Sequence, residues 1–297
     1  GGNLVVALSN PIASIEPGDY ETTEEHEVVA NVFETLVTTD PQGGLIPLLA
    51  ESWSLEDGGR TFRLRLRKQA AFSDGVPLTA PSVKRSFERS IRLSRQATPA
   101  AFAAIAGVDE FLDGRADSVA GITVLSDSEV EIRLHDALPV YPAFLTDGRT
   151  SIAAATPGDG GKEAIRGTGP FVVTSHAADR AVLDKNPTYW KDAPARLDRI
   201  EFRASLPAAA IAAGLKSGEY DVARDLLPQD REAILRDPRF RSGLVETPKK
   251  NSYFAVFHGG SAAGSNRALR HALAGVLRIQ DLVWGALGGR AIPATGL

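Results

Sequence analysis

The sequence contains no cysteine and no methionine. Without cysteine the chain has no disulfide, no thiolate metal ligand and no cysteine nucleophile. A signal peptide and long apolar runs are also missing, so no segment is predicted to span a membrane. The absence of methionine is unusual, and we have no physical account of it.

Neither sign of charge dominates the chain. The 33 lysine and arginine residues are almost balanced by 37 acidic residues, for a net charge of −4, and both signs are mixed along the sequence. This balance gives no electrostatic reason to expect nucleic acid or an anionic membrane as a partner. The 297 residues, 43% of them hydrophobic, suffice for two lobes or one large globular domain.

Residues 50–89 carry the strongest local pattern. Residues 61–67 alternate between apolar side chains and arginines, which predicts a strand with one buried face. Turns with glycine flank this strand at residues 56–59 and 73–75. A helix is predicted from Thr79, and its buried face is formed by Val83, Phe87 and Ile91.

Taken as one string, residues 50–89 resemble the family-5 extracellular solute-binding proteins, the oligopeptide, dipeptide and nickel receptors of ABC importers. That family combines Ala-x-x-Trp, an Asp-Gly turn, an alternating strand, and Asp-Gly-x-Pro-Leu-Thr-Ala before a helix with Ser-Phe. The corresponding residues are Ala50, Trp53, Asp57–Gly58, Thr61–Arg67, Asp74–Ala80 and Ser86–Phe87. One departure is Ser73, where the family usually has histidine.

Other segments agree with the same family in the same order. They are Asn31–Val37, Gly167–Phe171, Asn186–Trp190, Leu197–Phe202 and Leu215–Ala223. The resemblance covers essentially all of the chain, whereas family members continue well beyond Leu297. It therefore implies that the second lobe is cut short.

The resemblance implies an α/β fold of the type II periplasmic-binding-protein kind, a mixed-sheet lobe with an inserted antiparallel subdomain. We expect a lobe I core at 1–45 and 165–250, an inserted α+β subdomain at 46–164, and the truncated start of lobe II at 251–297. The predicted strands at 3–8, 200–203 and 220–223 should then share one sheet.

Several further elements follow from local patterns. Thr22 and Glu25 form a capping box that predicts a helix start. An alanine-rich helical stretch is expected over about 97–112, and a helix over 208–216 should end at Gly218. Asn266 is positioned to cap another helix.

No motif in the sequence predicts catalysis, a metal site or a cofactor. The five histidines lack helical metal-ligand spacing, although a site assembled from distant histidines stays open. No Gly-x-Ser-x-Gly elbow nominates a serine nucleophile. The Gly-x-Gly at 167–169 lacks the third glycine of a dinucleotide fingerprint and is interpreted as a tight turn.

The resemblance also implies where a ligand binds. In the family, the loop after the first strand lies at the cleft floor and offers backbone groups to the ligand. Here that loop holds Ala13, Ser14, Ile15 and Glu16, and the Glu16 carboxylate suits a cationic group. The alternative is that these residues only turn the chain. His258 is a second candidate, because it follows a predicted strand at 252–257 where the family often has asparagine.

The expected function is that of an extracytoplasmic receptor. The family captures a peptide or similar small solute between its lobes by hinge closure, pairs it as an added strand, and delivers it to an ABC permease. The receptor would act in the periplasm or at the outer face of the cytoplasmic membrane, with an anchor on a removed N-terminal segment left open. A sensor of the same fold and an enzyme are the alternatives. Residues 1–297 alone should bind poorly, since half of the site would lie beyond Leu297.

Overall fold

The computed structural model describes residues 1–157, 163–192, 195–224, 226–245, 256–285, 289 and 291–293. The chain forms two compact units, Gly1–Leu226 and Leu227–Leu297, and each is described here by itself. Within the described ranges, none of the helices has both the length and the apolar character needed to cross a membrane.

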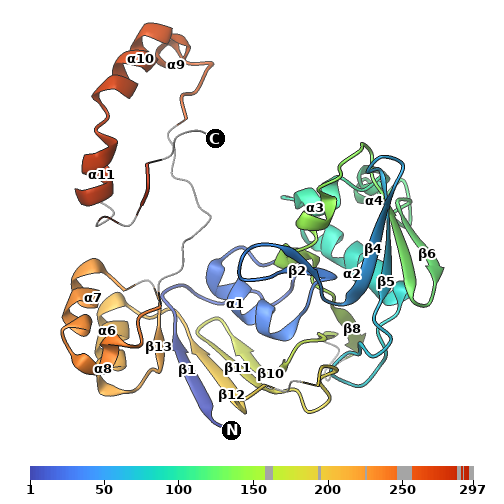
Figure 1. The fold of residues 1–297 in the computed structure, drawn as a ribbon, viewed down its shortest axis with the longest axis horizontal. Coiled ribbons are helices and arrows are strands. Elements are labelled where there is room, and N and C mark those ends of the chain that lie inside the picture. Colours follow the sequence, from blue (N-terminus) through green and yellow to red (C-terminus); the bar gives the residue numbers. More distant parts are fainter. Residues whose placement is uncertain are drawn as a thin grey trace. The chain divides into compact units, whose positions relative to one another are not determined.

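One of the two larger sheets of the first unit has five strands (Figure 1). Its order is β10 (Phe171–Ala177), β11 (Arg180–Lys185), β12 (Arg199–Arg203), β1 (Asn3–Ala7) and β13 (Val222–Ala223). Strand β1 is parallel to both of its neighbours, whereas β10, β11 and β12 form an antiparallel meander. The prediction that β1, β12 and β13 share a sheet is therefore confirmed.

Strand β1 is buried on both faces at its C-terminal end. Val6 packs into a core with helix α1 (Thr23–Val32), whereas Ala7 points into a second core beside α6 (Ala208–Ser217). Thr22 and Glu25 make the predicted capping box at the start of α1. Helix α6 ends at Gly218, which has a φ of +83° and so takes the left-handed conformation that favours glycine.

A second, antiparallel sheet has the order β4 (Ala50–Glu56), β5 (Thr61–Leu66), β7 (Glu129–Arg133) and β6 (Ile122–Ser126). Phe62, Leu64 and Leu66 are buried with residues of α2 (Ala80–Leu93). The arginines between them are exposed and paired, Arg63 with Glu131 at 3.0 Å and Arg65 with Glu129 at 3.2 Å. The predicted alternation is confirmed. Trp53, however, is only partly buried against this core.

The turn before α2 has the predicted geometry. Gly75 has a φ of +83° and its N–H donates to the Phe72 carbonyl at 2.9 Å, while Val76 N–H donates to the Asp74 carboxylate at 3.1 Å.

The prediction of a single helical stretch over about 97–112 is wrong. Two short helices stand in place of that stretch, α3 (Ala100–Ala103) and α4 (Val108–Leu112). Between them Ala106 exchanges backbone hydrogen bonds with Arg133 and Gly121, and Gly107 adopts a φ of +85°. These bonds to the sheet replace a turn of helix.

Shorter elements complete the first unit. They are β2 (Val37–Thr39), β3 (Leu45–Pro47), α5 (Tyr141–Phe144), the 3-10 helix η1 (Gly148–Thr150), β8 (Ala154–Pro157) and β9 (Glu163–Arg166). One hydrophobic core lies against the four-stranded sheet, and the five-stranded sheet packs against two others. The lobe and subdomain boundaries stay a prediction, because residues 1–226 form one compact unit.

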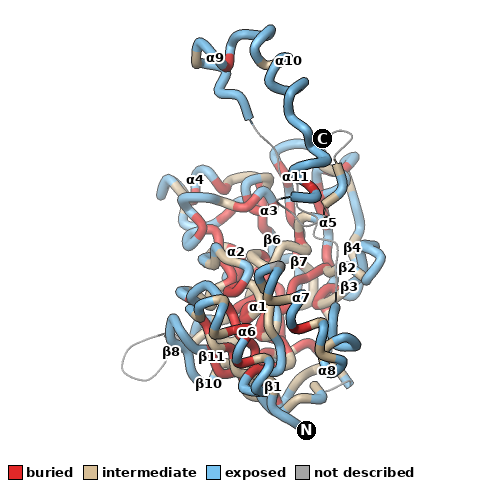
Figure 2. The backbone as a smooth tube through the Cα atoms, turned by 90° about the vertical axis from the view of Figure 1, so that its left-hand side faces the viewer, coloured by how far each residue is buried: buried red, intermediate tan, exposed pale blue. Residues whose placement is uncertain are grey.

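The second unit contains only helices among its described residues. They are α7 (Pro228–Leu235), α8 (Pro238–Arg241), α9 (Ala262–Ser265), α10 (Arg267–Val276) and α11 (Ile279–Gly285). Asn266 caps α10 as predicted, accepting from Leu269 N–H at 3.1 Å. Figure 2 shows that α9 and α10 are mostly exposed. Most of the strand predicted at 252–257 lies outside the described residues, and the described 256–257 are not strand.

Candidate functional site

The loop at residues 8–22 lies where ligands commonly bind in α/β proteins. It follows β1, and the parallel strands β1, β12 and β13 end at the same edge of the sheet. Ligand sites in open α/β sheets lie outside the carboxyl ends of parallel strands. The edge that holds this loop is therefore the candidate functional site, and Ala13, Ser14, Ile15 and Glu16 all belong to it.

A single buried carboxylate, that of Glu25, fixes the shape of this loop. Its Oε1 accepts from the N–H groups of Ala13 and Ser14, both at 2.9 Å. Its Oε2 accepts from Glu21 N–H at 2.7 Å and Thr22 N–H at 2.9 Å. Glu25 is only 3% exposed. Burial by itself raises the pKa of this carboxylate, but the hydrogen bonds outweigh it and lower the pKa overall.

A second set of contacts holds the loop against helix α2. The Glu16 carboxylate pairs with Arg89 at 2.7 Å. At Gly18, an added Cβ would lie 2.6 Å from Ser90 Cα, so only glycine permits this approach. Contacts with α1 and α2 thus hold the loop in place.

These contacts change how the predicted ligand residues are understood. The N–H groups of Ala13 and Ser14 already donate to Glu25, and the Glu16 carboxylate already has a cationic partner. Ile15 is half-buried against the core, and Ala13 is exposed. Ligand contact by these four residues stays a prediction.

Aromatic and charged side chains gather around Tyr20, near the end of the loop. Tyr20 donates to Asp147 at 3.4 Å, and its ring lies 5.4 Å from His26 and 5.6 Å from the Arg149 guanidinium carbon. Arg224, just after β13, pairs with Glu27 of α1. Sequence reasoning missed this group, because its members are up to about 200 residues apart and share no motif spacing.

The environment shifts two of these groups away from their charged forms. Burial lowers the pKa of His26; Asp147 opposes this effect, and Arg224 and Arg149 add to it. Burial and the Asp147 carboxylate raise the pKa of Tyr20. At pH 7 both rings are therefore neutral and can take part in hydrogen bonding or stacking.

His258, the remaining predicted ligand residue, belongs to the second unit. It is exposed, and its carbonyl accepts from Ser261 N–H at 3.0 Å and Ser261 Oγ at 2.9 Å, just before α9. Its role in a site stays a prediction. In the described part of the chain, no three acidic or histidine side chains gather where they could hold a metal ion.

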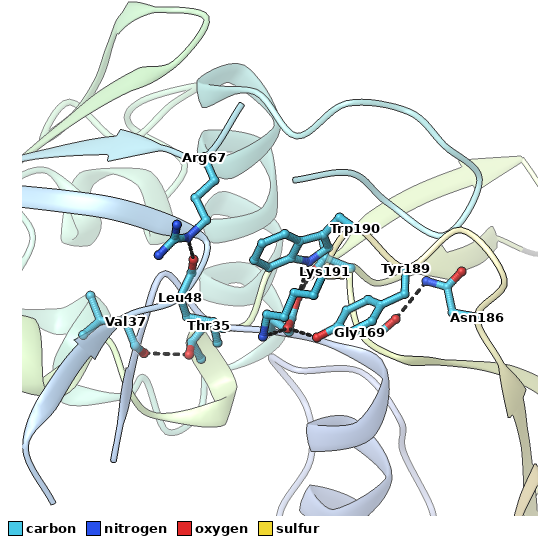
Figure 3. Close-up of polar contacts among 11 residues, drawn as sticks. Thr35, Val37, Leu48, Arg67, Gly169, Asn186, Tyr189, Trp190 and Lys191 are labelled. Atoms are coloured by element: carbon cyan, nitrogen blue, oxygen red, sulfur yellow. Dashed lines mark hydrogen bonds and ion pairs between the residues drawn. The ribbon is translucent and has the colours of Figure 1, made fainter. Parts of the chain in front are cut away.

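The signature segments recognised in the sequence converge on Glu34. This buried carboxylate accepts from Tyr189 OH at 2.8 Å, Trp190 Nε1 at 2.7 Å and Thr168 Oγ1 at 3.0 Å. Lys191 Nζ pairs with it at 2.9 Å. Figure 3 shows the three side chains of 189–191 pointing to one place. Because the Glu34 carboxylate already has four partners, we interpret it as a structural junction between distant segments and not as a ligand-binding group.

Close packing explains the glycines of residues 167–169. A Cβ added to Gly167 would lie 1.9 Å from the Val32 carbonyl oxygen, and Gly169 N–H donates to the same oxygen at 2.9 Å. Asn186 Nδ2 donates to the Gly169 carbonyl at 2.9 Å (Figure 3). The interpretation of this segment as a packed turn agrees with these contacts.

Replacing Glu25 with glutamine is expected to cost about 1–3 kcal/mol at neutral pH, because an amide NH2 would face N–H donors in hydrogen bonds that are partly buried. The folded-state pKa of Glu25 lies below its ordinary value of 4.5. Its stabilisation is therefore present above that value and is lost as pH falls through the folded pKa. Urea unfolding of both proteins between about pH 3 and 7 tests this. A constant difference in unfolding free energy across that range would contradict it.

Comparisons with known proteins agree with this structure. A family model described as "Bacterial extracellular solute-binding proteins, family 5 Middle" matches residues 44–297. The periplasmic oligopeptide-binding protein OppA of Escherichia coli is 30% identical over 241 residues, which are 76% of this chain and 43% of OppA. The murein peptide-binding protein MppA of the same organism is 25% identical over 281 residues, 91% of this chain and 52% of MppA.

Solved structures share the fold. The Escherichia coli murein tripeptide binding protein MppA matches with a TM-score of 0.80 at 23% identity, covering 98% of this chain and 59% of that structure. Haemophilus influenzae OppA in complex with RPPGFSPFR matches with a TM-score of 0.75 at 23% identity, covering 96% and 58%. The predicted mixed α/β fold is confirmed. The chain spans about half the length of the curated relatives it matches.

Proposed function

Because this chain belongs to the bacterial extracellular solute-binding proteins of family 5, we propose that it forms part of a receptor delivering peptides to an ABC importer. The observation that carries the proposal is the family match over residues 44–297. Peptides are the proposed class of solute, since relatives are named oligopeptide-binding and murein peptide-binding proteins. The proposed location is the periplasm or the outer face of the cytoplasmic membrane.

The geometry of the candidate edge is consistent with this role. Glu25 and Arg89 hold the loop in one shape before any ligand arrives, which lowers the entropic cost of binding. Ala13 is exposed and has no side chain beyond Cβ, so another backbone can approach closely. Extended peptides are recognised chiefly through their backbone groups, which leaves their side chains free to vary.

The residues proposed to contact the ligand are Ala13, Ser14, Ile15 and Glu16 and, separately, His258 of the second unit. Glu16 would act by holding the loop to α2 through Arg89 and by meeting a cationic group of the ligand. We propose no catalytic role, since the family consists of binding proteins.

Calorimetric titration with di- to nonapeptides tests the receptor proposal. A chain extended to the length of its relatives is expected to bind, whereas residues 1–297 alone should show no measurable affinity. At a hundred times the dissociation constant, a ligand adds about 2.7 kcal/mol of stability, so a thermal shift serves as a second readout.

Two different results would contradict separate parts of the proposal. If the extended chain binds no peptide in either assay, the peptide-receptor role is wrong. If residues 1–297 bind as tightly as the extended chain, the first lobe carries the site alone, and the closure of two lobes is wrong.

A further inference from the structure

A groove of about 410 Å³ lies along helix α2, beside helix α4. Three arginines of α2 line it, Arg85, Arg89 and Arg92, and Phe111 of α4 forms part of its wall. Spacings of four and three residues place these arginines on one side of the helix. The opposite side of α2 packs into the core, so the groove is part of the outer surface of the first unit.

Most charges near this groove already have partners. Glu88 accepts from Val119 N–H at 2.9 Å and lies 3.9 Å from Lys84, and Arg89 pairs with Glu16. Within the described residues, no carboxylate pairs with Arg85 or Arg92. Asp117 is the remaining acidic side chain in the lining. The positive charges of Arg85 and Arg92 therefore face one negative charge, that of Asp117.

Helix electrostatics do not account for both arginines. A cation in the last turn of a helix is favoured by the helix dipole, which suits Arg92. Arg85 lies in the second turn of α2, where the dipole offers a cation nothing. The exposed Arg85 guanidinium, which hydrogen-bonds Ser82 Oγ at 3.4 Å, is therefore available to an anionic partner.

Stacking on the Phe111 ring positions the Arg92 guanidinium so that it can bind a planar anionic group. Its guanidinium carbon lies 4.0 Å from the centre of the Phe111 ring, an arrangement that leaves the N–H edges open. Leu93 next to it is 38% exposed, so the groove also offers apolar surface. Pre-positioned arginine with aromatic and aliphatic neighbours is typical of residues that dominate protein–protein interfaces.

From these contacts we propose that the α2–α4 groove is a docking site for an acidic segment of a partner protein. Arg85 and Arg92 are seven residues apart on α2, about 10 Å along the axis. The segment therefore needs carboxylates spread over about that length, with an apolar residue to contact the exposed Leu93. A flat anionic membrane fits less well, because the arginines line a groove, which a narrow segment can enter and a flat surface cannot.

If the receptor role holds, the partner is the importer's membrane-embedded subunit; this identification alone rests on the proposed function. Arg89 both lines the groove and holds Glu16 of the loop at 8–22. A single ion pair, Arg89 with Glu16, therefore connects the docking site to the candidate ligand edge.

The test uses an acidic loop, Gly-Glu-Leu-Asp-Leu-Glu-Gly, displayed on a small carrier protein so that it is too large to be captured as a solute. Surface plasmon resonance measures its binding to the present chain and to the double variant Arg85→Gln/Arg92→Gln. Arg89 is left unchanged because it pairs with Glu16 and so holds the protein's own loop at residues 8–22. The control Arg63→Gln/Arg65→Gln removes two arginines that are already paired on the outer face of β5.

We expect the groove variant to weaken binding at least tenfold, the control to leave it unchanged, and a glutamine-asparagine version of the loop not to bind. Raising the salt concentration from about 50 to 200 mM should weaken binding, because exposed charges are screened. The proposal is overturned if the carrier does not bind, or if the groove variant binds equally well. It is also overturned if the binding of phosphatidylglycerol vesicles depends on Arg85 and Arg92 while the binding of the carrier does not. No free solute is present, so failure here leaves the receptor role untouched.

Discussion

Replacing Glu34 with alanine is expected to destabilise the protein by about 3–5 kcal/mol, because it removes one partner of a buried ion pair. Glu34 is 7% exposed, and four donors depend on its two oxygens. Three of these donors are neutral groups from distant parts of the chain, and the fourth is the Lys191 ammonium. Since the Lys191 side chain is 35% exposed, water can solvate it after the change, and the lower end of the range is expected.

Urea unfolding monitored by tryptophan fluorescence measures this loss, because Trp190 donates directly to Glu34. Glu129→Ala is the matched control, since Glu129 pairs with Arg65 on an exposed sheet face and should lose less than about 1 kcal/mol. Equal losses in the two variants would show that Glu34 is not the junction described here.

Replacing Phe62 with alanine is expected to cost about 3–5 kcal/mol, the usual loss when a large aromatic side chain is removed from a packed core. Phe62 is 1% exposed, and its ring lies 5.2 Å from that of Tyr141 at an interplanar angle of 44°. Tyr141 is itself fully buried, so little can move in to fill the cavity. The variant loses both apolar burial and an aromatic contact.

Leu55 supplies a matched control for Phe62. It is the partner of Phe62 across the β4–β5 pair, but it is 45% exposed. Leu55→Ala should therefore cost far less in chemical denaturation. A loss below about 1 kcal/mol for Phe62→Ala would mean that Phe62 is not the core residue that the alternation predicts.

Part of the candidate site could be predicted from the sequence. The resemblance located the loop after the first strand, and the structure places that loop at the carboxyl edge of three parallel strands. The sequence did not reveal that Glu25 occupies the N–H groups of Ala13 and Ser14, or that Arg89 pairs with Glu16. Nothing about a capping glutamate indicates that its second oxygen accepts from a loop eleven or twelve residues earlier.

Local patterns by themselves determined the elements whose causes are local. The alternation in residues 61–66 sets a strand with one buried face, and the capping box at Thr22 starts α1, because each depends on neighbours within a few residues. Only the tertiary structure decided that Gly107 breaks the expected helix and that Trp53 is only partly buried. It also decided that Glu34 gathers donors more than a hundred residues away. The partner of a buried polar group depends on which segments meet across the core, and no spacing along the chain records that meeting.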